Sequence, residues 1–130
     1  MKITYPIIIS KGKEYFIVYV PDFNINTQGT DTADAMKMAR DAIGIVGIDM
    51  EDENEALPIP TDITTIKRAN DSDIITLVDV DFTEYRRKND MRAVKKNCTV
   101  PSWLCYEAEK AGINFSATLQ AALKQELQLT

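Results

Sequence analysis

The chain has 130 residues, of which 45% are hydrophobic and 27% are charged, and its formal net charge at pH 7 is −5. It contains no histidine, which excludes acid–base chemistry, nucleophile activation and metal ligation that depend on an imidazole. Its apolar runs are short, and Lys2 leads into a strand-like segment instead of a signal peptide, so we expect a soluble cytoplasmic protein without membrane partners.

Three strands are predicted near the start of the chain. The β-rich runs Tyr5–Ser10 and Tyr15–Val20 are joined by Lys11-Gly12-Lys13, which is typical of a hairpin. Ile25–Gln28 supplies a third run of the same kind. Together these runs predict a small antiparallel sheet.

A helix is expected next. Asp31 and Asp34 resemble a capping box whose carboxylates face the positive end of the helix. Gly44 and Gly47 either weaken the last turns of this helix or permit close packing. Apolar residues recur at helical spacing: Ala35, Ala39, Ala42, Ile43 and Val46.

An acidic segment over residues 51–55 and the extended Pro58-Ile59-Pro60 lead to a further predicted strand at Ile74–Val80. Residues 1–82 are therefore expected to form an α+β domain, in which a helix covers one face of a small antiparallel sheet.

Charge divides the chain into two unlike parts. Residues 1–82 hold 7 Lys/Arg and 15 Asp/Glu, whereas residues 83–130 hold 8 and 5, so the parts carry −8 and +3. The segment 83–93 is predicted to be a basic linker, either a solvated connection or an arm that follows DNA phosphates. The basic residues there and just beyond are Arg86, Arg87, Lys88, Arg92, Lys95 and Lys96.

Residues 94–100 form a predicted strand with two unlike faces. Lys95, Asn97 and Thr99 lie on one face, while Lys96, Cys98 and the flanking valines lie on the other. A lone strand leaves its backbone groups unpaired, and a second copy pairing antiparallel across a two-fold axis would satisfy them. Such a ribbon fits the DNA major groove, so the polar face is expected to contact operator DNA.

Two amphipathic helices are expected after this strand, completing a domain over residues 94–130. Ser102 opens the first helix, Gly112 stops it, and Asn114 caps the second. The free N–H groups around Phe115 and Ser116 suit a DNA phosphate, which Arg92 is also expected to contact.

The apolar residues of this region predict a homodimer. The dimer core is expected to include Cys98, Val100, Leu104, Leu119 and Leu123. Cys98 and Cys105 match no zinc-site spacing, and we interpret both as small core residues and not as a disulfide or a metal pair. The alternative is an ordinary helical hairpin after an edge strand.

Both parts of the chain resemble one family. The segments Val20-Pro21-Asp22-Phe23, Thr27-Gln28-Gly29-Thr30 and Ala39-Arg40-Asp41-Ala42, with Tyr5-Pro6, Tyr15 and Ala35, resemble the N-terminal domain of HicB antitoxins. The segments from Lys95 to Leu104 and from Ile113 to Ser116 resemble the ribbon-helix-helix tail of that family. The chain departs from the family at Asn24-Ile25-Asn26, where members often have a Gly-Cys pair.

The resemblance implies a truncated ribonuclease H-like fold for residues 1–82 and a ribbon-helix-helix for residues 94–130. It implies an antitoxin whose N-terminal domain binds a small RNA-cleaving HicA-type toxin and whose C-terminal domain represses the shared operon. Tetramers of the dimers are a further expectation from the family. A stand-alone ribbon-helix-helix regulator with a ligand-sensing or oligomerising N-terminal domain is the alternative.

Nuclease chemistry is the enzymatic alternative, because ribonuclease H folds can bind divalent metals between carboxylates. The candidates Asp22, Asp31, Asp79 and Asp81 fall at strand ends, a helix cap and loops, where solvated or capping roles suffice. We therefore expect no catalytic residues, no metal and no cofactor.

Overall fold

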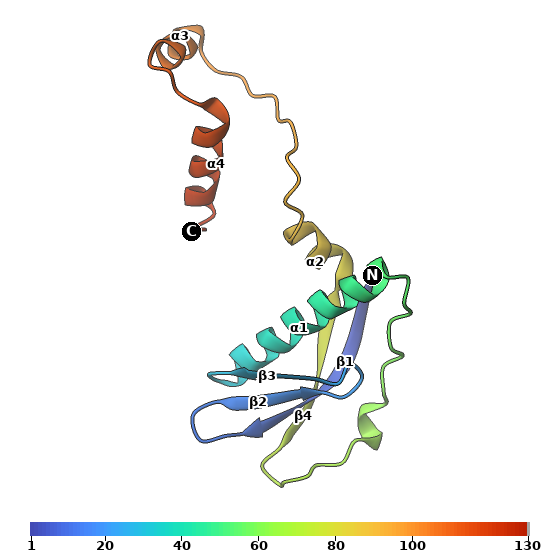
Figure 1. Cartoon of the computed structure of the whole chain (residues 1–130). Helices are drawn as coiled ribbons and strands as arrows, with labels where there is room; N and C mark the ends of the chain where they lie inside the picture. Colours follow the sequence, from blue (N-terminus) through green and yellow to red (C-terminus); the bar gives the residue numbers. More distant parts are fainter. Residues whose placement is uncertain (130) are drawn as a thin grey trace. The chain divides into compact units, whose positions relative to one another are not determined.

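The computed structural model of the chain describes residues 1–129 and contains an antiparallel sheet and four α-helices (Figure 1). It divides into two compact units, residues 1–91 and residues 92–130. The elements of the first unit are β1 (Lys2–Lys11), β2 (Phe16–Val20), β3 (Ile25–Gly29), α1 (Thr32–Asp52), a 3-10 turn η1 (Ile63–Thr65), β4 (Ile74–Asp81) and α2 (Phe82–Lys88). The second unit contains α3 (Ser102–Lys110) and α4 (Phe115–Glu126).

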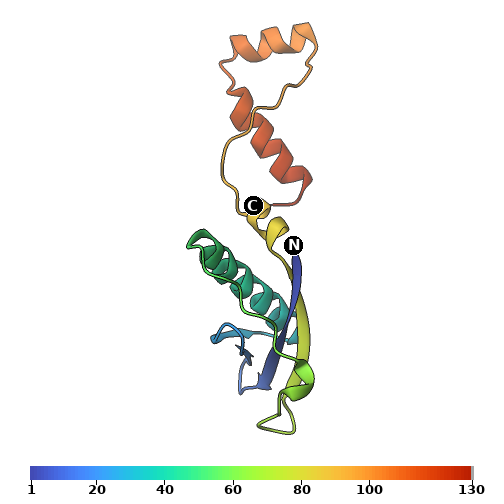
Figure 2. The same cartoon turned by 90° about the vertical axis from the view of Figure 1, so that its right-hand side faces the viewer.

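The sheet has the strand order β3-β2-β1-β4, and every neighbouring pair is antiparallel. Helix α1 covers one face, as Figure 2 shows. Side chains alternate along each strand, so Ile9 and its partner Val18 both face the helix and are buried. This arrangement confirms the predicted α+β class, with the buried core between sheet and helix.

The predicted start of α1 is confirmed at Asp31. Its carboxylate accepts a hydrogen bond from the Asp34 backbone N–H at 2.7 Å. In a standard capping box, the Asp34 carboxylate would accept from the N–H of the N-cap residue, Asp31. Here it accepts instead from the backbone N–H of Thr30, one residue earlier, at 2.9 Å. The Asp34 N–H, one of the unpaired N–H groups of the first turn, is thereby satisfied, and the Thr30 N–H just before the helix also gains a partner.

The segment between α1 and β4 is fixed to the sheet at two points. The Tyr5 hydroxyl donates to the Pro58 carbonyl at 2.9 Å, and Asp22 accepts from both the backbone N–H and the hydroxyl of Thr61. The Tyr5 ring also meets the Phe23 ring edge-on, with centroids 4.8 Å apart. Burial, with a smaller contribution from Asp22, raises the pKa of the Tyr5 hydroxyl.

Helix α2 is the main difference from the sequence-based expectation, which takes the segment 83–93 as a basic linker. Phe82 is only 2% exposed and belongs to the core of the first unit. Asp81 caps the helix by accepting from the Glu84 backbone N–H at 3.1 Å. The basic segment therefore begins as a packed helix, and the boundary between the units falls after Met91.

The glycines of α1 explain how α2 packs so closely. A Cβ atom at Gly44 would lie 2.8 Å from the Tyr85 ring, and one at Gly47 would overlap the ring of Phe82. Of the two roles considered for these glycines, close packing is the one that the structure shows. Each glycine removes a side chain where an aromatic ring of α2 needs the space.

We expect Gly47→Ala to destabilise the first unit. Alanine gains about 1 kcal/mol of helix propensity, but displacing the buried Phe82 ring costs roughly 1–3 kcal/mol. The free energy of unfolding from urea titration should therefore fall by about 1 kcal/mol. In a Phe82→Leu background the same change at Gly47 should cost less, because the smaller side chain leaves room for the added Cβ atom. A single variant as stable as the wild type would contradict the packing role.

Candidate interaction sites

The predicted ribbon segment carries no regular secondary structure in the single chain. Residues 90–101 are not assigned to a strand or helix, and each residue from 91 to 101 is exposed. Lys95, Asn97 and Thr99, the predicted base contacts, are therefore accessible. No paired strand accompanies residues 94–100 in the part of the chain that the structure describes, so the ribbon stays a prediction that requires a second copy.

The two helices of the second unit have the predicted boundaries. Gly112 adopts a φ of 72°, and its N–H donates to Glu109 while the Ile113 N–H donates to Ala108, which is a Schellman motif. The Asn114 side chain accepts from the Ala117 N–H at 3.0 Å and caps α4. The predicted phosphate contacts Phe115 and Ser116 thus occupy the first turn of a capped helix.

The apolar stripe of this unit is uncovered in the single chain. The predicted dimer contacts Leu104, Leu119 and Leu123 are 43%, 38% and 52% exposed, and Val100 is 40% exposed. Neither α3 nor α4 contains a buried residue. A unit of this size with no closed core lacks the burial needed for independent stability, which favours a partner surface.

The cysteines do not occupy a core in the single chain. Cys98 is exposed because its segment has no paired strand, and Cys105 is half-buried. Both are free thiols. The Cys105 thiol donates to the Glu109 carboxylate at 3.4 Å, and this hydrogen bond raises the pKa of the thiol. Burial of Cys98 therefore depends on the predicted dimer.

Some of the basic residues between positions 86 and 96 form ion pairs within the first unit, so they are not available to follow DNA phosphates. Arg86 forms ion pairs with Asp52 at 3.0 Å and with Glu51 at 3.8 Å, both on α1. Lys88 pairs with Glu84 at 3.6 Å within α2. These contacts assign Arg86 and Lys88 to the first unit, whereas the predicted DNA contacts Arg92, Lys95 and Asn97 belong to the second.

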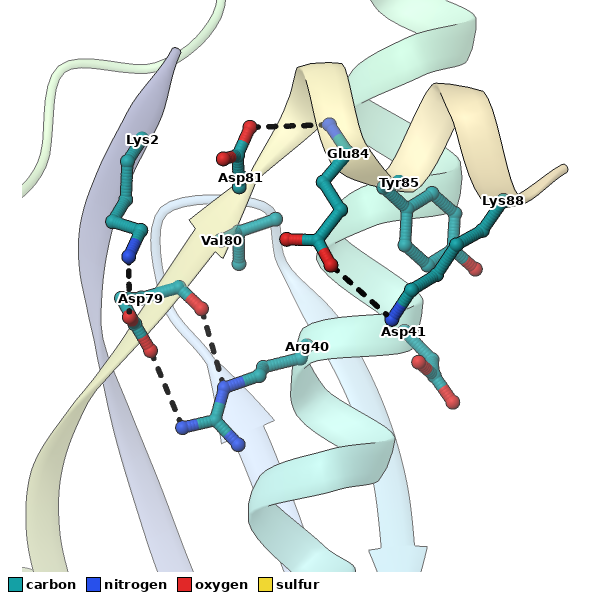
Figure 3. A pocket seen from close by; sticks show the side chains of 9 residues that line it. All are labelled: Lys2, Arg40, Asp41, Asp79, Val80, Asp81, Glu84, Tyr85 and Lys88. Carbon is teal, nitrogen blue, oxygen red and sulfur yellow. Dashed lines mark hydrogen bonds and ion pairs between the residues drawn. The ribbon is translucent and has the colours of Figure 1, made fainter. Parts of the chain in front are cut away.

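A polar pocket of about 230 Å³ lies between β4, α1 and α2 (Figure 3). Within it, the Arg40 guanidinium contacts the Asp79 carboxylate at 3.3 Å and the Asp79 carbonyl at 3.2 Å. Lys2 approaches the same carboxylate at 3.5 Å. A backbone hydrogen bond, together with Arg40 and Lys2, lowers the pKa of Asp79. The cations that line the pocket, Lys2, Arg40 and Lys88, are each paired with a carboxylate, whereas Asp41, which also lines it, has no ion pair among the described residues.

Each of the four carboxylates considered for metal binding has a structural partner. Asp22 binds Thr61, Asp31 and Asp81 cap helices, and Asp79 pairs with Arg40. Among the described residues, no group of three or more Cys, Asp or Glu side chains is arranged to hold a metal ion.

None of the helices in residues 1–129 has the length and apolar character of a membrane-spanning segment.

The N-cap carboxylate of α2, Asp81, makes the stability of the first unit depend on pH in the acid range. The hydrogen bond from the Glu84 N–H lowers the pKa of Asp81 below its ordinary value of 3.8. The stabilisation is therefore complete above that ordinary value and is lost as pH falls through the lower pKa of the folded state. Asp81→Asn keeps a capping oxygen but cannot titrate, so its unfolding free energy should fall less steeply below about pH 4. Denaturant titrations between pH 6 and pH 2.5 measure this slope; identical slopes would contradict it.

Residues 5–122 match the family described as HicB-like antitoxin of bacterial toxin-antitoxin systems. The chain belongs to the HicB-like antitoxin family. Comparison with curated proteins found no match. The resemblance that the sequence motifs indicated is therefore confirmed over most of the chain.

Solved structures agree with this family. The chain is similar to a chain of a toxin-antitoxin complex from Streptococcus pneumoniae, with 28% identity, a TM-score of 0.63, and coverage of 97% of this chain and 99% of that one. A chain of the HicA3 and HicB3 toxin-antitoxin complex is 29% identical over 61% of this chain and 99% of its own, with a TM-score of 0.51. The antitoxin HicB from Burkholderia pseudomallei, 19% identical with 97% of each chain covered and a TM-score of 0.55, shares the fold.

Sequence reasoning missed α2 as part of the first unit. Its signal was present, since Asp81 is followed three residues later by Glu84 and directly by the apolar Phe82. The density of basic residues after Tyr85 favoured the linker interpretation instead.

Proposed function

We propose that this protein is an antitoxin that binds and neutralises a small HicA-type RNA-cleaving toxin through its first unit. The observation that carries this proposal is the family match over residues 5–122, together with the similarity of 97% of the chain to a chain of a toxin-antitoxin complex. Neutralisation is by binding and not by catalysis. The structural engagement of the candidate carboxylates supports this role, since Asp31 and Asp81 cap helices and Asp79 pairs with Arg40.

The charge of the first unit supports a cationic partner. Residues 1–91 contain 10 Lys/Arg and 17 Asp/Glu, a net charge of −7, whereas residues 92–130 contain 5 and 3, a net charge of +2. A toxin that grips RNA needs a cationic surface, and a unit of opposite charge attracts and orients it. In this proposal the first unit is a truncated ribonuclease H-like domain adapted to protein binding.

The second unit is proposed to be a ribbon-helix-helix that represses the toxin-antitoxin operon as a homodimer. Two copies pair residues 94–100 as an antiparallel ribbon and bury the apolar stripes of α3 and α4 against each other. Lys95, Asn97 and Thr99 then face the major groove, while the first turn of α4 lies near a phosphate. The exposed apolar stripe and unpaired segment of the single chain support this assembly.

Co-expression tests the antitoxin role. The small reading frame next to this gene is expressed with a purification tag, alone and together with the full chain. Growth should stop with the neighbour alone and recover with the pair, and the two proteins should co-purify. A toxic neighbour that neither binds this chain nor is neutralised by it would favour the stand-alone regulator.

Salt should act mainly on the association rate of this complex. Exposed charges are screened over about 10 Å at 0.1 M ionic strength, whereas dry apolar contacts are not. Raising NaCl from about 0.05 to 0.5 M should therefore slow association by roughly tenfold or more, with a smaller change in dissociation. Surface-immobilised kinetics measure both rates; an association rate independent of salt would contradict charge steering.

A further inference from the structure

The side of α1 that faces away from the sheet combines exposed apolar residues with carboxylates. Residues three or four apart share one side of a helix. At this spacing, the side opposite the buried Ala35, Ala39 and Ile43 carries Asp34, Met38, Asp41, Ile45, Asp49 and Asp52. We call this set the α1 outer face. Figure 2 shows that α1 lies on one side of the sheet. Within the first unit, α2 borders this face at Asp41, which lines a pocket with Tyr85, and at Asp52, which pairs with Arg86.

The apolar members of the α1 outer face are accessible. The Ile45 side chain is 60% exposed and Met38 is 36% exposed. Isolated apolar residues are common on protein surfaces. These two are seven positions apart on one helix face, so they form one apolar strip that a single partner surface can cover.

Carboxylates surround this strip. Residues 31–55 contain eight Asp/Glu and two Lys/Arg, a net charge of −6. Asp34 bonds to Thr30 and Asp52 pairs with Arg86, so these two already have structural roles. Among the described residues, no ion pair engages Asp41 or Asp49. Asp49 is exposed, and Asp41 is half-buried and lines the pocket beside Tyr85 (Figure 3), so both carboxylates are unpaired groups that a cationic partner can neutralise.

The charge of the α1 outer face distinguishes between two possible partners, a second copy of this chain and a protein with a cationic surface. A second copy of this chain would place the same carboxylates against those of the α1 outer face, and this like-charge contact is unfavourable. A partner with a cationic surface gains attraction from the carboxylates and an apolar contact from Ile45 and Met38. The α1 outer face therefore fits a basic protein and opposes self-association.

The face of the sheet that points away from α1 carries a cluster of apolar side chains. By strand register, the residues that point away from α1 include Ile8, Ile17, Tyr19, Ile75 and Leu77. Ile17 is 50% exposed and Leu77 is 44% exposed. By the same register Lys2, Asp79 and Asp81 also lie on this side, but each is already in an ion pair, so they attract a cationic partner less than unpaired carboxylates do.

We propose that the α1 outer face is the docking surface for the cationic toxin, an inference that rests on the proposed function. Ile45 and Met38 are the apolar anchors that slow dissociation. Asp41 and Asp49 attract and orient the RNA-binding surface of the toxin, which then faces α1 and is closed to RNA.

The test compares two matched isoleucine variants of the full chain. Ile45→Ala and Ile17→Ala remove the same atoms from similarly exposed positions on opposite sides of the first unit. The probe is the purified product of the small neighbouring reading frame, and thermal unfolding checks that each variant folds. Ile45→Ala should weaken binding about tenfold or more through faster dissociation, whereas Ile17→Ala should change it by less than about twofold. The double variant Asp41→Asn/Asp49→Asn should slow association several-fold at low salt.

The outcomes separate this proposal from the proposed function. If the wild type binds the toxin but Ile45→Ala binds equally well, or Ile17→Ala loses as much affinity as Ile45→Ala, the assignment to α1 is overturned and the antitoxin role stands. If the wild type does not bind a toxin that is active on RNA, both fail.

Discussion

A chain ending at Met91 should fold and bind the toxin while losing all specific binding to operator DNA. Its sheet, α1 and α2 form one unit with its own core, and the predicted ribbon lies beyond it. A chain ending at Asp81 should be much less stable, because it lacks the buried Phe82 and the Tyr85 ring that packs on Gly44. Truncating a buried phenylalanine costs about 3–5 kcal/mol, a large fraction of the stability of a small domain.

Urea unfolding of the two fragments measures this difference, and gel-shift titration with the DNA upstream of the operon measures the loss of binding. The full chain is the control for both. Equal stability of the two fragments would show that α2 is not part of the core. Operator binding by residues 1–91 with full-chain affinity would contradict the assignment of DNA contacts to the second unit.

Asn97→Ala should weaken operator binding by about 1–3 kcal/mol, equivalent to roughly a tenfold to 150-fold rise in Kd. The asparagine lies at the centre of the predicted ribbon, and its amide can make two hydrogen bonds to an adenine edge. Because Asn97 is exposed in the single chain, its truncation removes no core contact. Binding to unrelated DNA, which depends on phosphate contacts, should change little.

Asn26→Ala is the matched control, since Asn26 is an exposed asparagine on β3 of the first unit and should leave DNA binding unchanged. Lys95→Ala distinguishes two roles for that lysine. A loss across many DNA sequences indicates a phosphate contact, whereas a loss only at the operator indicates a guanine contact. Normal operator affinity of Asn97→Ala would contradict the ribbon assignment.

Local chemistry was sufficient to predict much of the fold. The β-rich run Tyr5–Ser10 and the caps at Asp31 and Asn114 depend on neighbouring residues, and the structure confirms the strand and both caps. The contact of Gly47 with Phe82 joins residues far apart in sequence, so only the structure could show why that glycine is needed. Helix α2 was missed because its basic residues outweighed a short capping signal.

The predicted interaction sites depend on groups outside the single chain. Pairing of residues 94–100 needs hydrogen-bond partners from a second copy, and burial of Cys98 and Leu123 needs its apolar surface. The sequence indicates which side chains share a face, but the contacts themselves arise only on assembly. For the same reason the α1 outer face could be recognised only after α1 had been placed on the sheet.

Titration of RNA cleavage tests the antitoxin role most directly. Purified toxin from the neighbouring reading frame is mixed with a labelled RNA and increasing amounts of the full chain, with an equal series of heat-denatured chain as the control. Cleavage should fall in proportion to added antitoxin and stop when every toxin molecule is bound, while this chain alone cleaves no RNA. Cleavage that continues unchanged in excess antitoxin would contradict the proposed function.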